Sequence, residues 1–217
     1  SLLIGAVISS TDAASVFSVL RSKKLNLRYG TASILELESG SNDPWAYMLT
    51  VIILSVMKGG ATAGGFVVSL LAQVFFGVFF GALISLGAVY LIKRVRFDAA
   101  GFDAIFVTAI AILSYALPSA VGGNGYLSCY IVGIVLGNTK ISGKTALVHF
   151  FDGITGFTQI LLFFLLGLLA FPSQMPSIIL PAAAIALFLT FVARPAAVTV
   201  IMKPFGAKWK QIALISW

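Results

Sequence analysis

Residues Phe66–Ile92 read FVVSLLAQVFFGVFFGALISLGAVYLI, a run long enough to cross a hydrocarbon core of roughly 30 Å as a helix. In the whole chain 59% of residues are hydrophobic and 10% are charged, whereas a soluble domain carries about 25% charged residues. The bilayer requires internally satisfied backbone groups, and a barrel would give short alternating strands instead of continuous runs. The sequence therefore predicts an all-α polytopic membrane protein.

Seven hydrophobic segments and the start of an eighth are predicted to be membrane spans. They are Leu2–Leu20, Thr31–Met57, Gly65–Ile92, Phe102–Leu117, Tyr126–Gly137, Ile154–Phe171 and Ile178–Met202, with the eighth starting near Gln211. Tyr126–Gly137 is short and needs a packed, reentrant or thin-membrane environment. Since the first residues, SLLIGAVISS, contain neither Met nor the basic region of a signal peptide, we expect residues 1–217 to be a partial transmembrane domain of a longer transporter.

The cationic residues alternate between connections. The odd-numbered connections hold twelve Lys and Arg residues, and the even-numbered ones hold Lys58 alone. Short loops rich in Lys and Arg stay in the cytoplasm. The net charge of +7 therefore indicates orientation and contact with membrane lipid rather than nucleic-acid binding. The connections predicted to be cytoplasmic are Arg21–Arg28, Lys93–Arg96, Lys140–Lys144 and Lys203–Lys210.

Several smaller features bear on packing and chemistry. The sequences GVFFG (Gly77–Gly81) and GIVLG (Gly133–Gly137) have the spacing of close helix contacts. Cys129 is interpreted as a small packing residue, and His149 as a lone loop residue. The sequence shows no nucleophile–base pair and no metal-ligand set, so we expect no enzymatic activity and no bound cofactor.

Asp43 is the carboxylate that most needs an explanation. It lies about 12 residues after Thr31, roughly 18 Å from the predicted cytoplasmic end of its helix. A charge near the bilayer centre costs at least about 2.5–3.5 kcal/mol, and such groups face a partner or a water-filled path. Asp12 is expected at a similar depth on the preceding span. Polar residues precede both carboxylates: Ser9, Ser10 and Thr11 before Asp12, and Ser39, Ser41 and Asn42 before Asp43.

Oxygen-rich clusters of this kind suit hard cations such as Na⁺ or K⁺. Burial favours the protonated form of a carboxylate and a nearby cation favours its ionised form, so one group can bind a proton or a metal cation in turn. Asp43 is predicted to do so, and Pro44 removes a backbone donor beside it. A structural alternative stays open, because buried Ser and Thr often bond back to their own helix and Asp12 could be a packing contact.

Glu38 and Arg194 are predicted to form a structural ion pair. Arg194 stays charged when buried and lies about 9 residues before Lys203, roughly 13 Å deep. Glu38 has a comparable depth and points about 140° away from Asp43 around the same helix. Asp43 is then left to face the ion path. Glu36, nearer the cytoplasmic end, is interpreted as a solvated carboxylate.

The motifs resemble a known family. GAVISSTDAASVFSVL (Gly5–Leu20) and LELESGSNDPWAYML (Leu35–Leu49) are similar to the monovalent cation:proton antiporter-1 family, the relatives of sodium–proton exchangers. SSTDAA and ESGSNDP are closest to its bacterial potassium–proton, cell-volume-regulation branch. The resemblance continues through YIVGIVLGN (Tyr130–Asn138), ARPAAV (Ala193–Val198) and the final ISW.

The resemblance implies an inverted-repeat antiporter fold with a broken helix near Thr11–Asp12. By its motifs, Asp43 of the Asn42–Asp43 pair carries the proton or the cation. Thr11 and Asp12, with backbone carbonyls, help to bind the ion, and Ser39 is a cation ligand in some members.

The resemblance also implies the Glu38–Arg194 ion pair and a homodimer in the bacterial inner membrane. The expected function is exchange of K⁺ or Na⁺ for protons. Ala13 after Thr11–Asp12, together with Gly40 and Ser41, departs from the sodium exchangers and favours K⁺. A potassium efflux system of the glutathione-gated type and a non-transporting membrane scaffold remain as alternatives.

Overall fold

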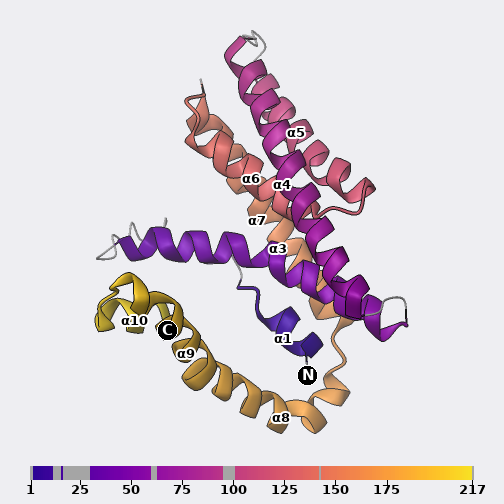
Figure 1. Ribbon diagram of the computed structural model, residues 1–217, viewed down its shortest axis with the longest axis vertical. Coiled ribbons are helices and arrows are strands. Elements are labelled where there is room, and N and C mark those ends of the chain that lie inside the picture. The colour runs from indigo at the N-terminus through magenta and orange to yellow at the C-terminus, as the bar shows by residue number, and fades with distance from the viewer. Residues whose placement is uncertain are drawn as a thin grey trace. The chain divides into compact units, whose positions relative to one another are not determined.

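The computed structural model describes residues 2–11, 16, 30–59, 63–94, 101–141 and 143–216. The regular elements of these ranges are helices, which confirms the all-α prediction (Figure 1). The chain divides into two compact units, residues 1–13 with 38–155 and residues 14–37 with 156–217. The main helices are α1 (Leu2–Ile8), α3 (Thr31–Met57), α4 (Ala63–Arg94), α5 (Phe102–Ala120), α6 (Gly125–Asn138), α7 (Lys144–Leu169), α8 (Met175–Phe188), α9 (Arg194–Met202) and α10 (Trp209–Ser216).

Among the described residues, four helical stretches have the length and hydropathy to cross a membrane: Gly64–Arg94, Phe102–Ala120, Lys144–Leu169 and Pro172–Phe205. The predicted polytopic membrane protein is thereby confirmed. Two further predicted spans form helices that are not among these four. Helix α3 is long enough, but its three carboxylates and the polar run Ser39–Asp43 lower its hydropathy. Helix α6 is apolar but has only 14 residues.

One predicted boundary requires correction. The span expected at Ile154–Phe171 starts earlier, because α7 begins at Lys144. His149, expected in a loop, therefore lies inside a helix. Leu147 is buried, so the apolar face of α7 extends upstream of the predicted start. In the first predicted span the described helical residues are Leu2–Ile8 and Val16, and residues 12–15 and 17–29 lie outside the described ranges.

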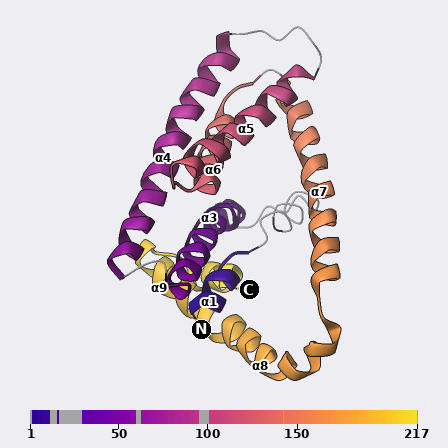
Figure 2. The same ribbon diagram turned by 90° about the vertical axis from the view of Figure 1, so that its right-hand side faces the viewer.

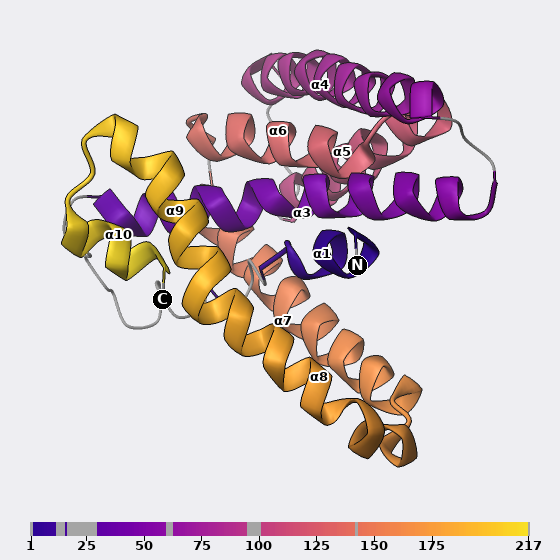
Figure 3. The same ribbon diagram turned by 60° about the horizontal axis from the view of Figure 1, so that its bottom comes forward.

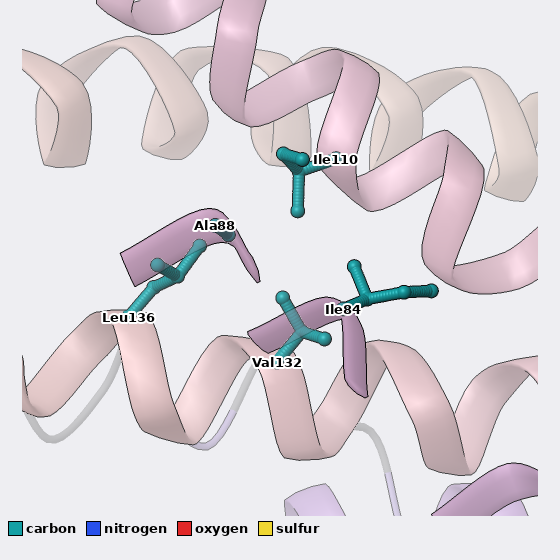
Figure 4. Packing of buried hydrophobic residues seen from close by; sticks show 5 residues of the cluster. All are labelled: Ile84, Ala88, Ile110, Val132 and Leu136. Carbon is teal, nitrogen blue, oxygen red and sulfur yellow. The ribbon is translucent and has the colours of Figure 1, made fainter. Parts of the chain in front are cut away.

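Helices α4, α5 and α6 pack together in the first unit (Figure 2). Helix α6 runs parallel to α4: the backbone N–H of Asn124 donates to the carbonyl of Gln73 at 3.0 Å, and further along Leu136 packs in one cluster with Ala88. The buried apolar residues between the three helices are Ile84, Ala88, Ile110, Val132 and Leu136 (Figure 4).

Two glycines of α4 allow α6 to approach closely. A Cβ at Gly77 would lie 2.9 Å from the backbone oxygen of Asn124, and a Cβ at Gly81 would lie 3.1 Å from the Cβ of Ile131. The prediction for GVFFG is thus confirmed. The same prediction for Gly133–Gly137 is wrong within the described structure, since a Cβ at either glycine meets no atom within 4 Å. Helix α6 presents a different face to α4.

The end of the α5–α6 turn, at Gly123 and Asn124, is packed against the neighbouring helices. Helix α6 starts beside Gln73, which is about ten residues, or about 15 Å, past the start of α4. Irregular backbone at membrane depth needs partners within the protein. The N–H of Gly123 donates to a carbonyl in the last turn of α5 at 2.7 Å, and the Asn124 side chain accepts from Leu127 N at 3.1 Å. The short helix α6 therefore begins in a packed environment, which is one of the three environments predicted for a span of its length.

In the second unit, α8 and α9 join through a π-type turn at Leu189–Ala193 (Figure 3). The N–H of Arg194 donates to the carbonyl of Leu189 across this wider turn. Pro195 follows, and it has no N–H to donate. Turns of this kind are frequent at functional sites. Helix α10 packs against α9, with Ile212 and Ile215 buried.

Candidate functional site

Polar side chains from two segments of the first unit meet beside Asp43. Helix α1 ends before Ser10 and Thr11, so these two residues are outside regular helix. Ser39 and Asp43 lie on α3 four residues apart, and Asn42 lies three residues after Ser39, which puts all three on neighbouring positions of one face. Figure 3 shows α1 lying alongside α3.

Three side-chain hydrogen bonds join the two segments. Asn42 Nδ2 donates to Thr11 Oγ1 at 2.7 Å, and Thr11 Oγ1 donates to Ser39 Oγ at 3.1 Å. The hydroxyl of Ser10 donates to Asp43 Oδ1. Ser39 is only 3% exposed. The result is a cluster of hydroxyl, amide and carboxylate oxygens between a non-helical segment and the middle of a helix.

The carbonyl oxygen of the Asn42 side chain stands out in this cluster. It is buried, and no donor among the described residues reaches it, although the amide nitrogen of the same side chain is bonded to Thr11. A buried acceptor without a partner costs about 1–3 kcal/mol. A cation would use such an oxygen as a ligand, since hard cations are bound by carbonyl and carboxylate oxygens. The next residue, Asp43, supplies the carboxylate.

Two other serines of the same sequence motifs take the structural role that the sequence left open. Ser9 Oγ donates to the carbonyl of Ala6 at 2.7 Å, and Ser41 Oγ donates to the carbonyl of Glu38 at 3.2 Å. Both bonds return to the backbone three residues earlier and satisfy only the local helix. The bonds of Ser10, Thr11 and Ser39 to side chains on the other segment have no such local explanation.

Helix α6 contacts α3 on both sides of Asp43 in the sequence. A Cβ at Gly40 would lie 2.8 Å from Cε2 of Tyr130, so this tyrosine ring packs directly on the helix backbone. One turn later Asn124 Nδ2 donates to the carbonyl of Pro44 at 2.9 Å. Asn124 and Tyr130 were not among the predicted site residues. A polar side chain in the turn between two apolar helices is the sequence signal that singles out Asn124.

The roles of the other predicted site residues stay predictions. Asp12 lies outside the described residues, and its role stays a prediction. Glu38 belongs to the first unit and Arg194 to the second, so their ion pair also stays a prediction. Within the second unit, Arg194 is half-buried and its Nη2 donates to the carbonyl of Ile215 at 3.3 Å. The predicted site residues that the structure brings together are Thr11, Ser39, Asn42 and Asp43, to which it adds Ser10.

A family model described as "Sodium/hydrogen exchanger, transmembrane" matches residues 1–217. The chain belongs to this exchanger family. The resemblance stated from its two N-terminal motifs is thereby confirmed, and the oxygen cluster around Asp43 is formed by those motifs.

Three relatives have names that specify the exchanged cation, which is K⁺ in two of them and Na⁺ in the third. The chain is 41% identical over 227 residues to "K(+)/H(+) antiporter NhaP2" of Shewanella oneidensis, and 38% identical over 217 residues to "K(+)/H(+) antiporter NhaP" of Alkalimonas amylolytica. Both matches cover 100% of this chain and 38% of the relative. "Probable Na(+)/H(+) antiporter 2" of Methanocaldococcus jannaschii is 28% identical over 92% of this chain and 49% of its own length. The chain thus spans 38% of the length of the first two relatives and about half the length of the third.

Proposed function

We propose that the full-length protein is a secondary antiporter that exchanges a monovalent cation for protons across the bacterial inner membrane, with K⁺ favoured over Na⁺. The observation that carries the proposal is the interhelical network of Ser10, Thr11, Ser39, Asn42 and Asp43, which places a carboxylate and a buried acceptor oxygen together. The preference for K⁺ is supported by the names of the two more similar relatives.

In this proposal Asp43 binds a proton or a cation in turn. The proton neutralises the carboxylate, whereas the cation needs it ionised and draws further ligand oxygens from Asn42, Ser39 and Thr11. A hydroxyl group both donates and accepts, so Ser10 can bond to the carboxylate when the cation is absent and rotate when it arrives. Exchange follows when the loaded site opens to either side in turn, and the ion gradients supply the energy.

The placement of cations supports the proposed orientation. Lys93 and Arg94 end α4. Lys144 begins α7, and its Nζ donates to the carbonyl of Gly137 near the end of α6. A Cβ at Gly143 would lie 3.8 Å from Asp103 Oδ2 in the first turn of α5, so the starts of α5 and α7 lie near each other. We propose that this end of the first unit is cytoplasmic.

The proposed partners are the transported ions, membrane lipid and a second copy of the full-length protein. Lipid contact is supported by α7, because Leu147 is the one buried residue of this helix and its other residues are exposed or half-buried. Such a surface requires hydrocarbon or another apolar protein surface around it. The homodimer rests on the family resemblance.

The direct test is an antiport assay on the full-length protein in vesicles that contain a pH-sensitive dye. Asp43→Asn preserves the size and the acceptor oxygen of the side chain but cannot ionise, so we expect no cation-induced proton movement with K⁺ or Na⁺. Asp103→Asn, which removes a carboxylate outside the cluster, is the matched control and should behave as wild type. Wild-type exchange by Asp43→Asn would contradict the role proposed for Asp43, whereas no exchange by the wild-type protein would favour the membrane scaffold that transports nothing.

A further inference from the structure

We infer that Asn124 is a positioning residue of the ion site, because its side-chain amide bonds to the carbonyl of Pro44 and so fixes the turn of α3 that carries Asp43. The inference rests on the proposed function and assigns to α6 a part in setting cation affinity. Asn124 belongs to neither N-terminal motif and lies 80 residues after Pro44 in the chain.

Asn124 is fully buried, with 0% of its surface exposed, and three of its groups are bonded to three different elements. Its Nδ2 donates to the Pro44 carbonyl of α3 at 2.9 Å. Its Oδ1 accepts from the N–H of Leu127 at 3.1 Å and caps α6. Its backbone N–H donates to the Gln73 carbonyl of α4 at 3.0 Å. A buried polar residue with this many partners couples the positions of the helices that it joins.

The backbone around Asn124 has little room to move. A Cβ at Gly125 would lie 2.6 Å from the carbonyl oxygen of Tyr115, and a Cβ at Gly123 would lie 2.5 Å from the Cβ of Phe76. A Cβ at Gly77 would lie 2.9 Å from the backbone oxygen of Asn124. The α5–α6 turn is therefore held against α4 and α5 by direct backbone packing, so the amide that reaches Pro44 starts from a fixed point.

The same part of α6 contacts α3 at two more positions. Tyr130 packs on Gly40, and the ring of Tyr126 lies 4.6 Å from the ring of Tyr47 between centroids. The α3 residues in contact are Gly40, Pro44 and Tyr47, which follow one face of the helix at successive turns. Asp43 precedes the middle one. Helix α6 thus contacts the stretch that carries the carboxylate at three positions, and the contact at Pro44 is a hydrogen bond.

Because of Pro44, the hydrogen bond from Asn124 is important for the position of Asp43. It has no N–H, so the helical bond that would tie Pro44 to the preceding turn of α3 is missing. The carbonyl bond to Asn124 supplies a tie from outside the helix. Without it, we expect Asp43 and Asn42 to shift against Ser10 and Thr11, and small displacements of ligand oxygens weaken cation binding.

The test compares two asparagines of α6 in the full-length protein. Asn124→Ser keeps a hydroxyl that can cap α6 but is too short to reach Pro44. Asn138→Ser is the matched control, since Asn138 ends the same helix, is exposed, and donates only to the carbonyl of Ile134 at 2.8 Å. We expect Asn124→Ser to raise the half-saturating K⁺ concentration in the antiport assay by about two- to tenfold, the effect of one lost hydrogen bond. Asn138→Ser should leave it unchanged.

If the role of Asn124 is purely structural, a different result is expected. Asn124→Ser then lowers the amount of folded protein, measured by size-exclusion chromatography, while the half-saturating K⁺ concentration of the folded fraction stays at the wild-type value. That outcome, or wild-type behaviour in every respect, overturns the inference. If Asn124→Ser gives no folded protein, Asn124→Thr carries the same test with a hydroxyl cap and an added methyl group.

The result also separates this inference from the proposed function. If wild type shows no exchange, or if Asp43→Asn exchanges normally, the proposed function fails and the Asn124 variants are uninformative about ions. If wild type exchanges and Asp43→Asn does not, a normal half-saturating concentration in Asn124→Ser refutes the positioning role alone.

Discussion

The segment that follows α1 is joined to α3 in a different way from α4 and α6. Between Ser10–Thr11 and α3 the described contacts are hydrogen bonds among hydroxyl, amide and carboxylate groups, centred on Ser39 and Asp43. Between α4 and α6 they are glycine contacts, in which Gly77 and Gly81 let the helices approach until an added Cβ would clash. The first contact depends on hydrogen-bonding groups, whereas the second depends on shape alone.

The difference follows from the solvent. Lipid is as apolar as Leu, so burying apolar side chains contributes little to helix association in a membrane, and close packing of small residues contributes more. A glycine contact therefore suffices where two helices only need to stay together. A polar cluster is costly at the same depth and is retained where an ion or a proton uses it. The three predictions below test this division.

The largest effect is expected from filling the glycine contact. Gly81→Leu must displace Ile131 and the backbone of Ser128, which lie 3.1 and 3.2 Å from the ideal Cβ, and overpacking of this kind costs about 1–3 kcal/mol. Gly87→Leu is the control on the same helix, where a Cβ meets nothing within 4 Å. Thermal unfolding in detergent should show a lower midpoint for Gly81→Leu only. Equal midpoints would mean that the α4–α6 contact does not hold the fold.

The next effect concerns competition in the polar cluster. If a proton and a cation bind Asp43 in turn, a tenfold rise in K⁺ displaces the proton at lower pH, and the pH of half-maximal exchange falls by about one unit. The dye assay at several K⁺ concentrations measures this shift. A half-maximal pH that does not depend on K⁺ would indicate separate sites for the two ions. The Gly87→Leu protein should show the wild-type shift, since its change lies outside the cluster.

The smallest effect separates two serines of one helix. Ser39→Ala removes the acceptor of the Thr11 hydroxyl and should raise the half-saturating K⁺ concentration about fivefold, the equivalent of about 1 kcal/mol. Ser41→Ala removes only a bond to the carbonyl of Glu38 and should have no effect. If both variants bind K⁺ equally well, the Thr11–Ser39 bond does not contribute to the ion site.

The membrane class, the helical content and the family were readable from the sequence, because hydropathy and motif identity are properties of contiguous residues. Asp43, Asn42, Ser39 and Thr11 were recognised for the same reason: their motifs place polar groups where lipid makes them costly. The start of α7 was misplaced by ten residues, from Ile154 back to Lys144, because polar residues at the end of a membrane helix hide its continuation.

Only the tertiary structure showed that neighbouring serines have different hydrogen-bond partners. Ser9 and Ser10 are adjacent, and Ser39 and Ser41 lie within one turn of α3. In each pair one serine bonds to its own helix and the other to the opposite segment. The partner of Asn124 lies 80 residues away. Hydropathy is a sum over a local window, so the sequence determines it alone. A hydrogen-bond partner depends on where two distant backbones come within about 3 Å, and packing alone decides that.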